Sequence, residues 1–228
     1  MSQGPRLVML GKQGAGKGTQ AARLAEHYRI VHLSTGDLFR AAANAGTRFG
    51  LQAKDYMDRG ELVPDDVTVG LVEERFSADG SPLRGGFVLD GFPRNRNQAV
   101  ELDRVLDGLP LDLAIDLDVP RDVVLERLAG RRVCSRCGAV YHVDMPPSRP
   151  WVCDVCGGEV VQRDDDTEEA ISRRLELYEE ETVPVLDYYR ARWKLAVVDG
   201  VGSGDDVFER LVKVIDDWRA SPPGPPSQ

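Results

Sequence analysis

The chain has 228 residues, of which 42% are hydrophobic and 29% are charged, and its formal net charge is −9. This length is sufficient for one buried core with insertions, and because nucleic-acid-binding proteins are usually basic, the acidic balance argues against general nucleic-acid binding. The sequence contains neither an apolar run of about 18 residues nor signal-peptide features in residues 1–6, so we expect a cytoplasmic protein.

Short apolar segments alternate with helix-forming segments along the chain. Five apolar segments have the character of buried strands: 7–10, 30–33, 86–90, 113–119 and 195–199. Helix-forming segments are 21–26, 38–57 with breaks near Gly46 and Gly50, 65–75, 120–128, 167–192 and 205–218. This alternation predicts an α/β fold with a five-stranded parallel sheet flanked by helices. The proline-rich residues 221–228 are expected to be disordered.

A glycine-rich segment, Gly11 to Gln20, follows the first predicted strand and precedes a helix. In this context, backbone N–H groups and a helix N-terminus form a cradle for phosphate oxygens, and Lys17 adds a positive charge near the β- and γ-phosphates. Here Lys17 is followed by Gly18, whereas the general pattern has Ser or Thr at that position. A glycine-rich turn that binds no ligand is the alternative interpretation.

Two further motifs follow the second and third predicted strands. Residues 33–40 read LSTGDLFR, and residues 90–94 read DGFPR. Asp90 at the carboxyl end of a strand beside a phosphate loop suits a magnesium shell, and Arg94 suits bidentate contact with a phosphate. The alternatives are a capped helix start and a turn with a surface arginine.

The four cysteines form two C-x-x-C pairs, which are Cys134 with Cys137 and Cys153 with Cys156. Two such pairs at this separation are typical of a tetrahedral zinc site, and a closed four-thiolate shell is typical of a structural metal. Two disulfides, a redox pair and a zinc ribbon for nucleic acid are the alternatives.

Taken together, these motifs resemble the adenylate kinases, in the bacterial long-lid form with a tetracysteine zinc lid, over residues 6–218. The resemblance implies a P-loop nucleoside monophosphate kinase that transfers phosphoryl groups reversibly from Mg-ATP to AMP, giving two ADP and serving adenine nucleotide homeostasis. It also implies a monomer with structural Zn²⁺. The implied units are a core of residues 1–33, 64–129 and 167–220, an NMP-binding insert of residues 34–63, and a lid of residues 130–166.

The resemblance also implies roles for individual residues. The residues expected to bind ATP are Gly14, Ala15, Gly16, Lys17, Gly18, Thr19, Arg127, Arg131, Val140, Tyr141 and Gly202. The residues expected to bind AMP are Thr35, Arg40, Glu61, Leu62, Val63, Gly91, Phe92, Pro93, Arg94, Gln98, Arg163 and Arg174. The residues expected to be catalytic are Lys17, Arg94, Arg131, Arg163 and Arg174. Within the AMP set, Gln98 is the position that reads the adenine edge.

The implied reaction needs no general base, because the attacking phosphate oxygen of AMP is already anionic. Positioning and electrostatic stabilisation would supply most of the catalysis. Two other interpretations remain open at this point. One is a monophosphate kinase that uses UMP or CMP, and the other is a nucleotide-binding regulatory module that carries a zinc ribbon for a partner.

Overall fold

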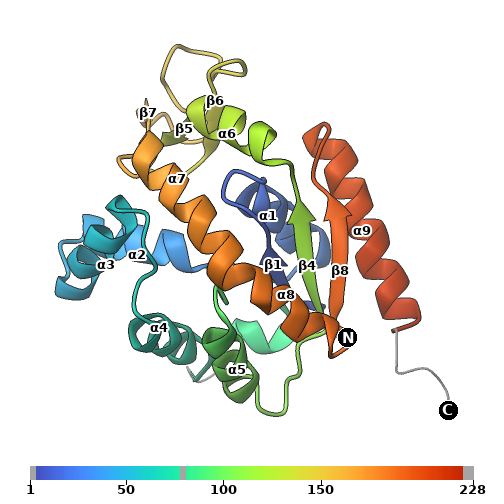
Figure 1. The fold of residues 1–228 in the computed structure, drawn as a ribbon. Helices are drawn as coiled ribbons and strands as arrows, with labels where there is room; N and C mark the ends of the chain where they lie inside the picture. Colours follow the sequence, from blue (N-terminus) through green and yellow to red (C-terminus); the bar gives the residue numbers. More distant parts are fainter. Residues whose placement is uncertain (1–3, 78–80, 223–228) are drawn as a thin grey trace, which may run out of the picture.

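The computed structural model describes residues 4–77 and 81–222, and its centre is a five-stranded parallel sheet (Figure 1). The strand order is β2-β3-β1-β4-β8, and every neighbouring pair is parallel. The strands are β1 (Arg6–Leu10), β2 (Val31–Ser34), β3 (Phe87–Asp90), β4 (Leu113–Asp118) and β8 (Leu195–Asp199). The five-stranded parallel sheet predicted from the apolar segments is therefore confirmed.

Helices pack against both faces of this sheet. The helices in the described residues are α1 (Lys17–Tyr28), α2 (Thr35–Asn44), α3 (Arg48–Asp58), α4 (Asp65–Ser77), α5 (Arg96–Val105), α6 (Arg121–Ala129), α7 (Glu168–Leu177), α8 (Val183–Arg190) and α9 (Gly204–Ala220), of which α3 packs on α2. A short 3₁₀ helix, Pro82–Gly85, precedes β3. No helix within the described ranges is long and apolar enough to cross a membrane.

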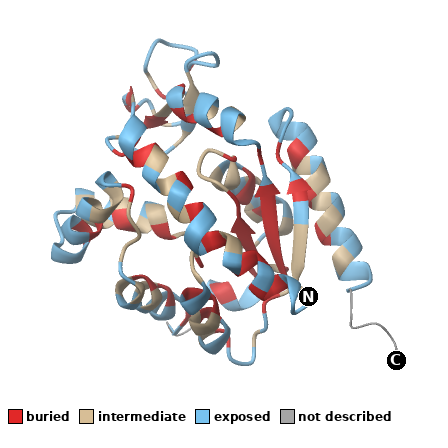
Figure 2. Ribbon diagram, in the orientation of Figure 1, coloured by how far each residue is buried: buried red, intermediate tan, exposed pale blue. Residues whose placement is uncertain are grey.

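The central strand β1 divides the hydrophobic core into two layers. Leu7 and Met9 point into a layer that contains α1 and α9, whereas Val8 and Leu10 point into a layer that contains α4, α5 and α8. Figure 2 shows β1 and β4 in the buried colour, between helices whose outer faces are exposed. Because both faces of the strand are buried, it appears in the sequence as a continuous apolar run instead of an alternating one.

Several helix boundaries differ from the sequence prediction. The second helix begins at Thr35 instead of about residue 38, because the Ser34 hydroxyl accepts a hydrogen bond from Asp37 N and caps it there. Gly50 does not break a helix: a Cβ at this position would lie 2.2 Å from the backbone of Ala42, so the glycine allows α3 to pack closely on α2.

One helix of the structure was not predicted from the sequence, and one predicted helix is interrupted. The helix α5 was not predicted, and its start is fixed by Asn95, whose side chain accepts a hydrogen bond from Gln98 N. The predicted helix 167–192 is divided by a π-helical segment, Tyr178–Thr182, between α7 and α8. The Tyr178 hydroxyl donates to buried Asp116 on β4, so this segment is tied to the sheet.

A second, smaller sheet lies between α6 and α7 in the chain, and the sequence prediction did not include it. Its strands are antiparallel in the order β6-β5-β7, with β5 at Arg131–Cys134, β6 at Val140–His142 and β7 at Val160–Val161. Figure 1 shows this sheet above α6 and α7, away from the main sheet. Of the terminal segment expected to be disordered, residues 223–228 lie outside the described residues, and Ser221 and Pro222 are exposed.

We predict that Leu117→Ala lowers the free energy of unfolding by about 2–5 kcal/mol, because Leu117 is fully buried on β4 and its truncation leaves a cavity. The matched control is Leu125→Ala on α6, where the leucine is exposed and the expected loss is about 0.5 kcal/mol. Urea denaturation followed by circular dichroism measures both changes. Equal losses in the two variants would contradict the placement of Leu117 in the core.

Candidate active site

The glycine-rich loop lies between the end of β1 and the start of α1. Gly11, Gly14 and Gly16 have φ values of 130°, 83° and 101°, a backbone region that favours glycine. At Gly11 a Cβ would also lie only 2.6 Å from the carbonyl oxygen of Leu117, so the loop runs directly against β4. The helix α1 starts without a side-chain cap, which leaves its first N–H groups available to an anion.

The side chain of Lys17 folds back over this loop. Its ammonium donates to the carbonyl oxygens of Gly11 at 2.7 Å and Lys12 at 2.8 Å. Burial lowers the pKa of Lys17 to about 8, against the opposing effect of the Asp90 charge, and the charges of Arg94 and Arg131 contribute to the lowering. The loop therefore holds a cation whose charge the surrounding protein does not fully balance.

The glycine after Lys17, which departs from the general pattern, has a steric explanation. A Cβ at Gly18 would lie 3.1 Å from Oδ2 of Asp90, which ends β3. A side chain here would crowd the carboxylate against the loop. The same proximity places a carboxylate oxygen, a ligand type that Mg²⁺ prefers, beside the phosphate loop.

The motifs that follow β2 and β3 are bonded to each other. The hydroxyl of Thr35 donates to the carbonyl oxygen of Gly91 at 3.0 Å, and Nε of Arg94 donates to the same oxygen at 2.9 Å. The backbone N–H of Arg94 donates to Oε1 of Gln98 at 2.8 Å. These bonds bring four of the expected AMP-binding residues into one bonded network at the carboxyl edge of the sheet.

Cationic side chains from distant segments converge on this edge. Burial lowers the pKa of Arg94 to about 10, with a further contribution from the charge of Arg174. Burial likewise lowers the pKa of Arg163 to about 10, with further contributions from Arg40 and Arg131. Such mutual lowering requires the charges to lie near one another. The convergent cations are Lys17, Arg40, Arg94, Arg131, Arg163 and Arg174.

Two buried aspartates orient part of this cluster, and the sequence analysis assigned them no role. Asp166 accepts a hydrogen bond from Nε of Arg131 at 2.7 Å and a second, shorter one from Nη2. Asp165 accepts from Nη2 of Arg174 at 2.6 Å, and that same nitrogen also donates to the carbonyl oxygen of Met57. The only sequence signal was an acidic run directly after Arg163, and acidic runs are usually solvated.

Arg174 retains an unused hydrogen-bond donor. Its Nη1 atom is buried and has no hydrogen-bond partner within the described part of the chain, although Oδ1 of Asp166 lies 4.0 Å away. A buried guanidinium nitrogen without a partner carries a desolvation cost that an anionic ligand would offset. This donor thus marks a position for a phosphate-like group.

The other expected ATP-binding residues differ in their contacts with the phosphate loop. Arg127 donates to the carbonyl oxygens of Ala15 and Gly200, each at 3.1 Å, and so joins α6 to the phosphate loop and to the segment after β8. Gly202 lies in that segment with a φ of 122°. By contrast, neither Val140 nor Tyr141 forms a hydrogen bond with the phosphate loop within residues 4–77 and 81–222.

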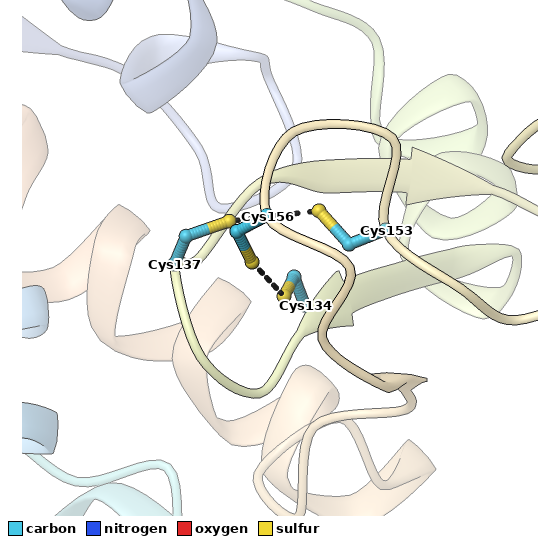
Figure 3. A group of neighbouring side chains, drawn as sticks. All are labelled: Cys134, Cys137, Cys153 and Cys156. Carbon is cyan, nitrogen blue, oxygen red and sulfur yellow. Dashed lines mark hydrogen bonds between the residues drawn. The ribbon is translucent and has the colours of Figure 1, made fainter.

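The four cysteine side chains point toward one another from two turns of the small sheet (Figure 3). Their Sγ atoms all lie within 4.8 Å of one another, with 3.5 Å between Cys134 and Cys156 and 3.6 Å between Cys137 and Cys153. The hydroxyl of Tyr141 donates to Sγ of Cys153 at 3.3 Å and accepts from Asp154 N. Four sulfurs in one compact group match the ligand set of a tetrahedral zinc site.

A parallel sheet whose first strand leads into a phosphate loop, with arginines converging on the same edge, defines a P-loop nucleoside monophosphate kinase. The family model described as "Adenylate kinase" matches residues 9–194. A protein named adenylate kinase from Thermodesulfovibrio yellowstonii is 53% identical over 214 residues, covering 92% of this chain and 99% of that protein.

Other relatives agree with this assignment. Adenylate kinase from Bacillus subtilis is 51% identical over 205 residues, covering 89% of this chain and 94% of its own length. Adenylate kinase from Streptomyces griseus is 50% identical over 214 residues, covering 92% and 97%. The chain therefore belongs to the adenylate kinase family, and its enzymatic function is that of this family of phosphotransferases. The prediction from the sequence motifs that the chain is an adenylate kinase is confirmed.

The low pKa of Lys17 predicts an unusual reactivity in the nucleotide-free protein. Amines react with acetic anhydride only when neutral, so the rate at Lys17 should be half-maximal at about pH 8 and level off above it, whereas an ordinary lysine has its midpoint near 10.5. Peptide mass spectrometry measures the rate, with exposed Lys213 as the internal reference for reagent. A rate that continues to rise beyond pH 10 would contradict the burial of an unbalanced ammonium.

Proposed function

We propose that ATP and AMP bind on the two sides of this sheet edge and that the phosphoryl group passes between them at the cation cluster. The supporting observation is that Lys17 and five arginines meet there, and that burial together with neighbouring positive charges lowers the pKa of Lys17, Arg94 and Arg163 although nearby carboxylates oppose this lowering. Two phosphorylated nucleotides supply the missing negative charge. The buried, unpartnered Nη1 of Arg174 points to the same conclusion.

On the donor side, the phosphate loop and the N-terminus of α1 hold the phosphates of ATP. Lys17 leaves the loop carbonyls and moves onto the β- and γ-phosphates, while Arg127 and Arg131 contact the polyphosphate from α6 and β5. When bound, Mg²⁺ neutralises charge between the β- and γ-phosphates, and Asp90 is the residue that would hold it through its shell. Val140, Tyr141 and Gly202 cover the adenine.

On the acceptor side, the bonded network around Gly91 holds AMP. Arg40, Arg94, Arg163 and Arg174 surround its phosphate, and Thr35, Gln98 and residues 61–63 contact its base. The attacking oxygen belongs to this phosphate and is already anionic, so no side chain has to remove a proton. The arginines reduce the repulsion between the two nucleotides and stabilise the charge that develops on the transferring group.

Residues 34–63 and 130–166 act as two mobile covers over a core made of the remaining units. Their closure excludes water, which would otherwise accept the phosphoryl group, and carries Val140 and Tyr141 to the donor site. Lys54 and Asp164 form an ion pair at 3.6 Å that joins these two covers directly. Because one chain supplies every residue of the site, a monomer is sufficient for activity.

The small sheet holds structural Zn²⁺ through Cys134, Cys137, Cys153 and Cys156. Among the described residues, these four thiols form one group of possible metal ligands. Four thiolates would fill a tetrahedral shell and leave no open coordination site. The buried apolar cluster of this sheet contains only Val160 besides two of the cysteines, so the metal replaces a hydrophobic core. Reduced thiolate ligands also fit a cytoplasmic location.

The proposed role of Lys17 predicts that Lys17→Met removes most of the ATP + AMP ⇌ 2 ADP turnover while the protein remains folded. The physical reason is that the loop places this single ammonium at the β- and γ-phosphates. Coupled measurement of ADP formation gives the turnover, and circular dichroism checks the fold. Lys213→Met, at an exposed position on α9, is the control with the same change of charge. Near-normal turnover in folded Lys17→Met would disprove the donor assignment.

The proposed structural zinc predicts that replacing Cys153 and Cys156 by Ser lowers the melting temperature and the zinc content together. Turnover at low temperature should persist, because Lys17 and the arginines lie outside the metal shell. Val155→Ser changes an exposed residue of the same turn and is the control. Metal analysis, thermal unfolding and turnover are measured on the same samples. Wild-type protein without about one zinc per chain, or loss of turnover at an unchanged melting temperature, would contradict the structural role.

A further inference from the structure

The side-chain amide of Gln98 is held from both ends. This residue is 2% exposed in the first turn of α5, and its Oε1 accepts from the backbone N–H of Arg94 at 2.8 Å. Its Nε2 donates to Oδ1 of Asp65 at 2.8 Å. A backbone N–H can only donate and a carboxylate can only accept, so these partners determine which end of the amide carries oxygen.

Asp65, at the start of α4, is the central acceptor of this network. Its Oδ1 also accepts from Nδ2 of Asn95 at 2.9 Å. Asn95 is itself fixed, because its Oδ1 caps α5 by accepting from Gln98 N at 2.9 Å. If the Gln98 amide turned over, its oxygen would face the carboxylate and its NH₂ group would face the Arg94 N–H. Both ends would then lose their hydrogen bonds in a buried site.

A fixed amide distinguishes between two kinds of purine edge. Adenine presents a 6-amino donor beside the N1 acceptor, whereas a 6-oxopurine presents a 6-oxo acceptor beside an N1–H donor. The remaining lone pair on Oε1 and the remaining N–H on Nε2 form one acceptor–donor pair, which complements only one of these edges. A freely rotating amide would complement both.

We infer that Asp65 is a positioning residue that fixes the Gln98 amide and thereby makes the acceptor site select a 6-aminopurine over a 6-oxopurine. This inference rests on the proposed role of Gln98 as the reader of the AMP base. It adds a specificity determinant from α4, a helix to which none of the expected nucleotide-binding residues belongs. Asp65 acts through Gln98 and needs no contact of its own with the nucleotide.

The test compares Asp65→Ala with Asp66→Ala. Both residues lie in the first turn of α4, so both changes remove the same favourable charge from the helix N-terminus, but Asp66 is exposed. Each variant is assayed for the KM of AMP, the KM of ATP and the inhibition constant of inosine monophosphate as a competitor of AMP. Thermal unfolding checks the fold, and Asp65→Leu, which keeps the shape of the side chain but has no acceptor, replaces Asp65→Ala if the latter does not fold.

We expect Asp65→Ala to raise the KM of AMP about tenfold with the KM of ATP nearly unchanged, because the loss affects only base recognition. The ratio of the inosine monophosphate inhibition constant to the AMP KM should fall about tenfold. Asp66→Ala should change neither quantity. An unchanged AMP KM, or an unchanged ratio, in folded Asp65→Ala overturns the inference. If inosine monophosphate does not compete with AMP in any variant, the KM of AMP and a double-mutant cycle with Gln98→Ala decide whether the inference holds.

A double-mutant cycle with Gln98→Ala separates this inference from the proposed function. If Asp65 acts through Gln98, the double variant should have the same AMP KM as Gln98→Ala alone. If the two substitutions instead multiply each other's effect on the KM of AMP, the positioning role of Asp65 is overturned, while the proposed acceptor site is not. An AMP KM that Gln98→Ala does not change would instead overturn the acceptor role of Gln98, and this inference with it.

Discussion

The structure is organised around the mutual repulsion of positive charges at one edge of a parallel sheet. Lys17, Arg94 and Arg163 each have a lowered pKa because they are buried and because other cations lie close to them. Such a cluster is unfavourable in a protein without ligand, and only a rigid framework can hold it together. The doubly packed sheet provides that framework, since its inner strands β1, β3 and β4 are buried and its strands deliver the loops to a single edge.

The partial compensation of this charge has a consistent geometry. Carboxylates and carbonyl oxygens bind one side of a cationic group and leave donors on the other side unused. Asp165 and Asp166 hold Arg174 and Arg131, and the loop carbonyls hold the Lys17 ammonium. These hydrogen bonds orient the cationic groups in the absence of a ligand, so little reorganisation would be needed to stabilise negative charge that develops at this edge. The Asp65–Gln98 network applies the same device to a neutral amide.

The small sheet follows a different physical rule from the core. The core layers are filled by large apolar side chains from every strand, whereas the small sheet buries Val133, Val160 and little else of apolar character besides its cysteines. A unit of this size gains little stability from hydrophobic burial, and its four clustered thiols offer a ligand set that suits a structural metal.

The sequence by itself determined the features that depend on neighbouring residues. The apolar runs define five buried strands, the glycines and Lys17 define a phosphate loop, and the paired cysteines define a compact group of thiols. Each of these patterns fits within one turn, one strand or one loop, where local geometry follows from residue type. Only the tertiary structure decided which charges meet: Asp166 is 35 residues from Arg131, and Asp65 is 33 residues from Gln98. Such partners cannot be recognised in a single sequence, because residues that are hydrogen-bonded between distant segments have no characteristic spacing. The glycine after Lys17 appeared as an exception for the same reason, since its cause is the carboxylate of Asp90 on another strand.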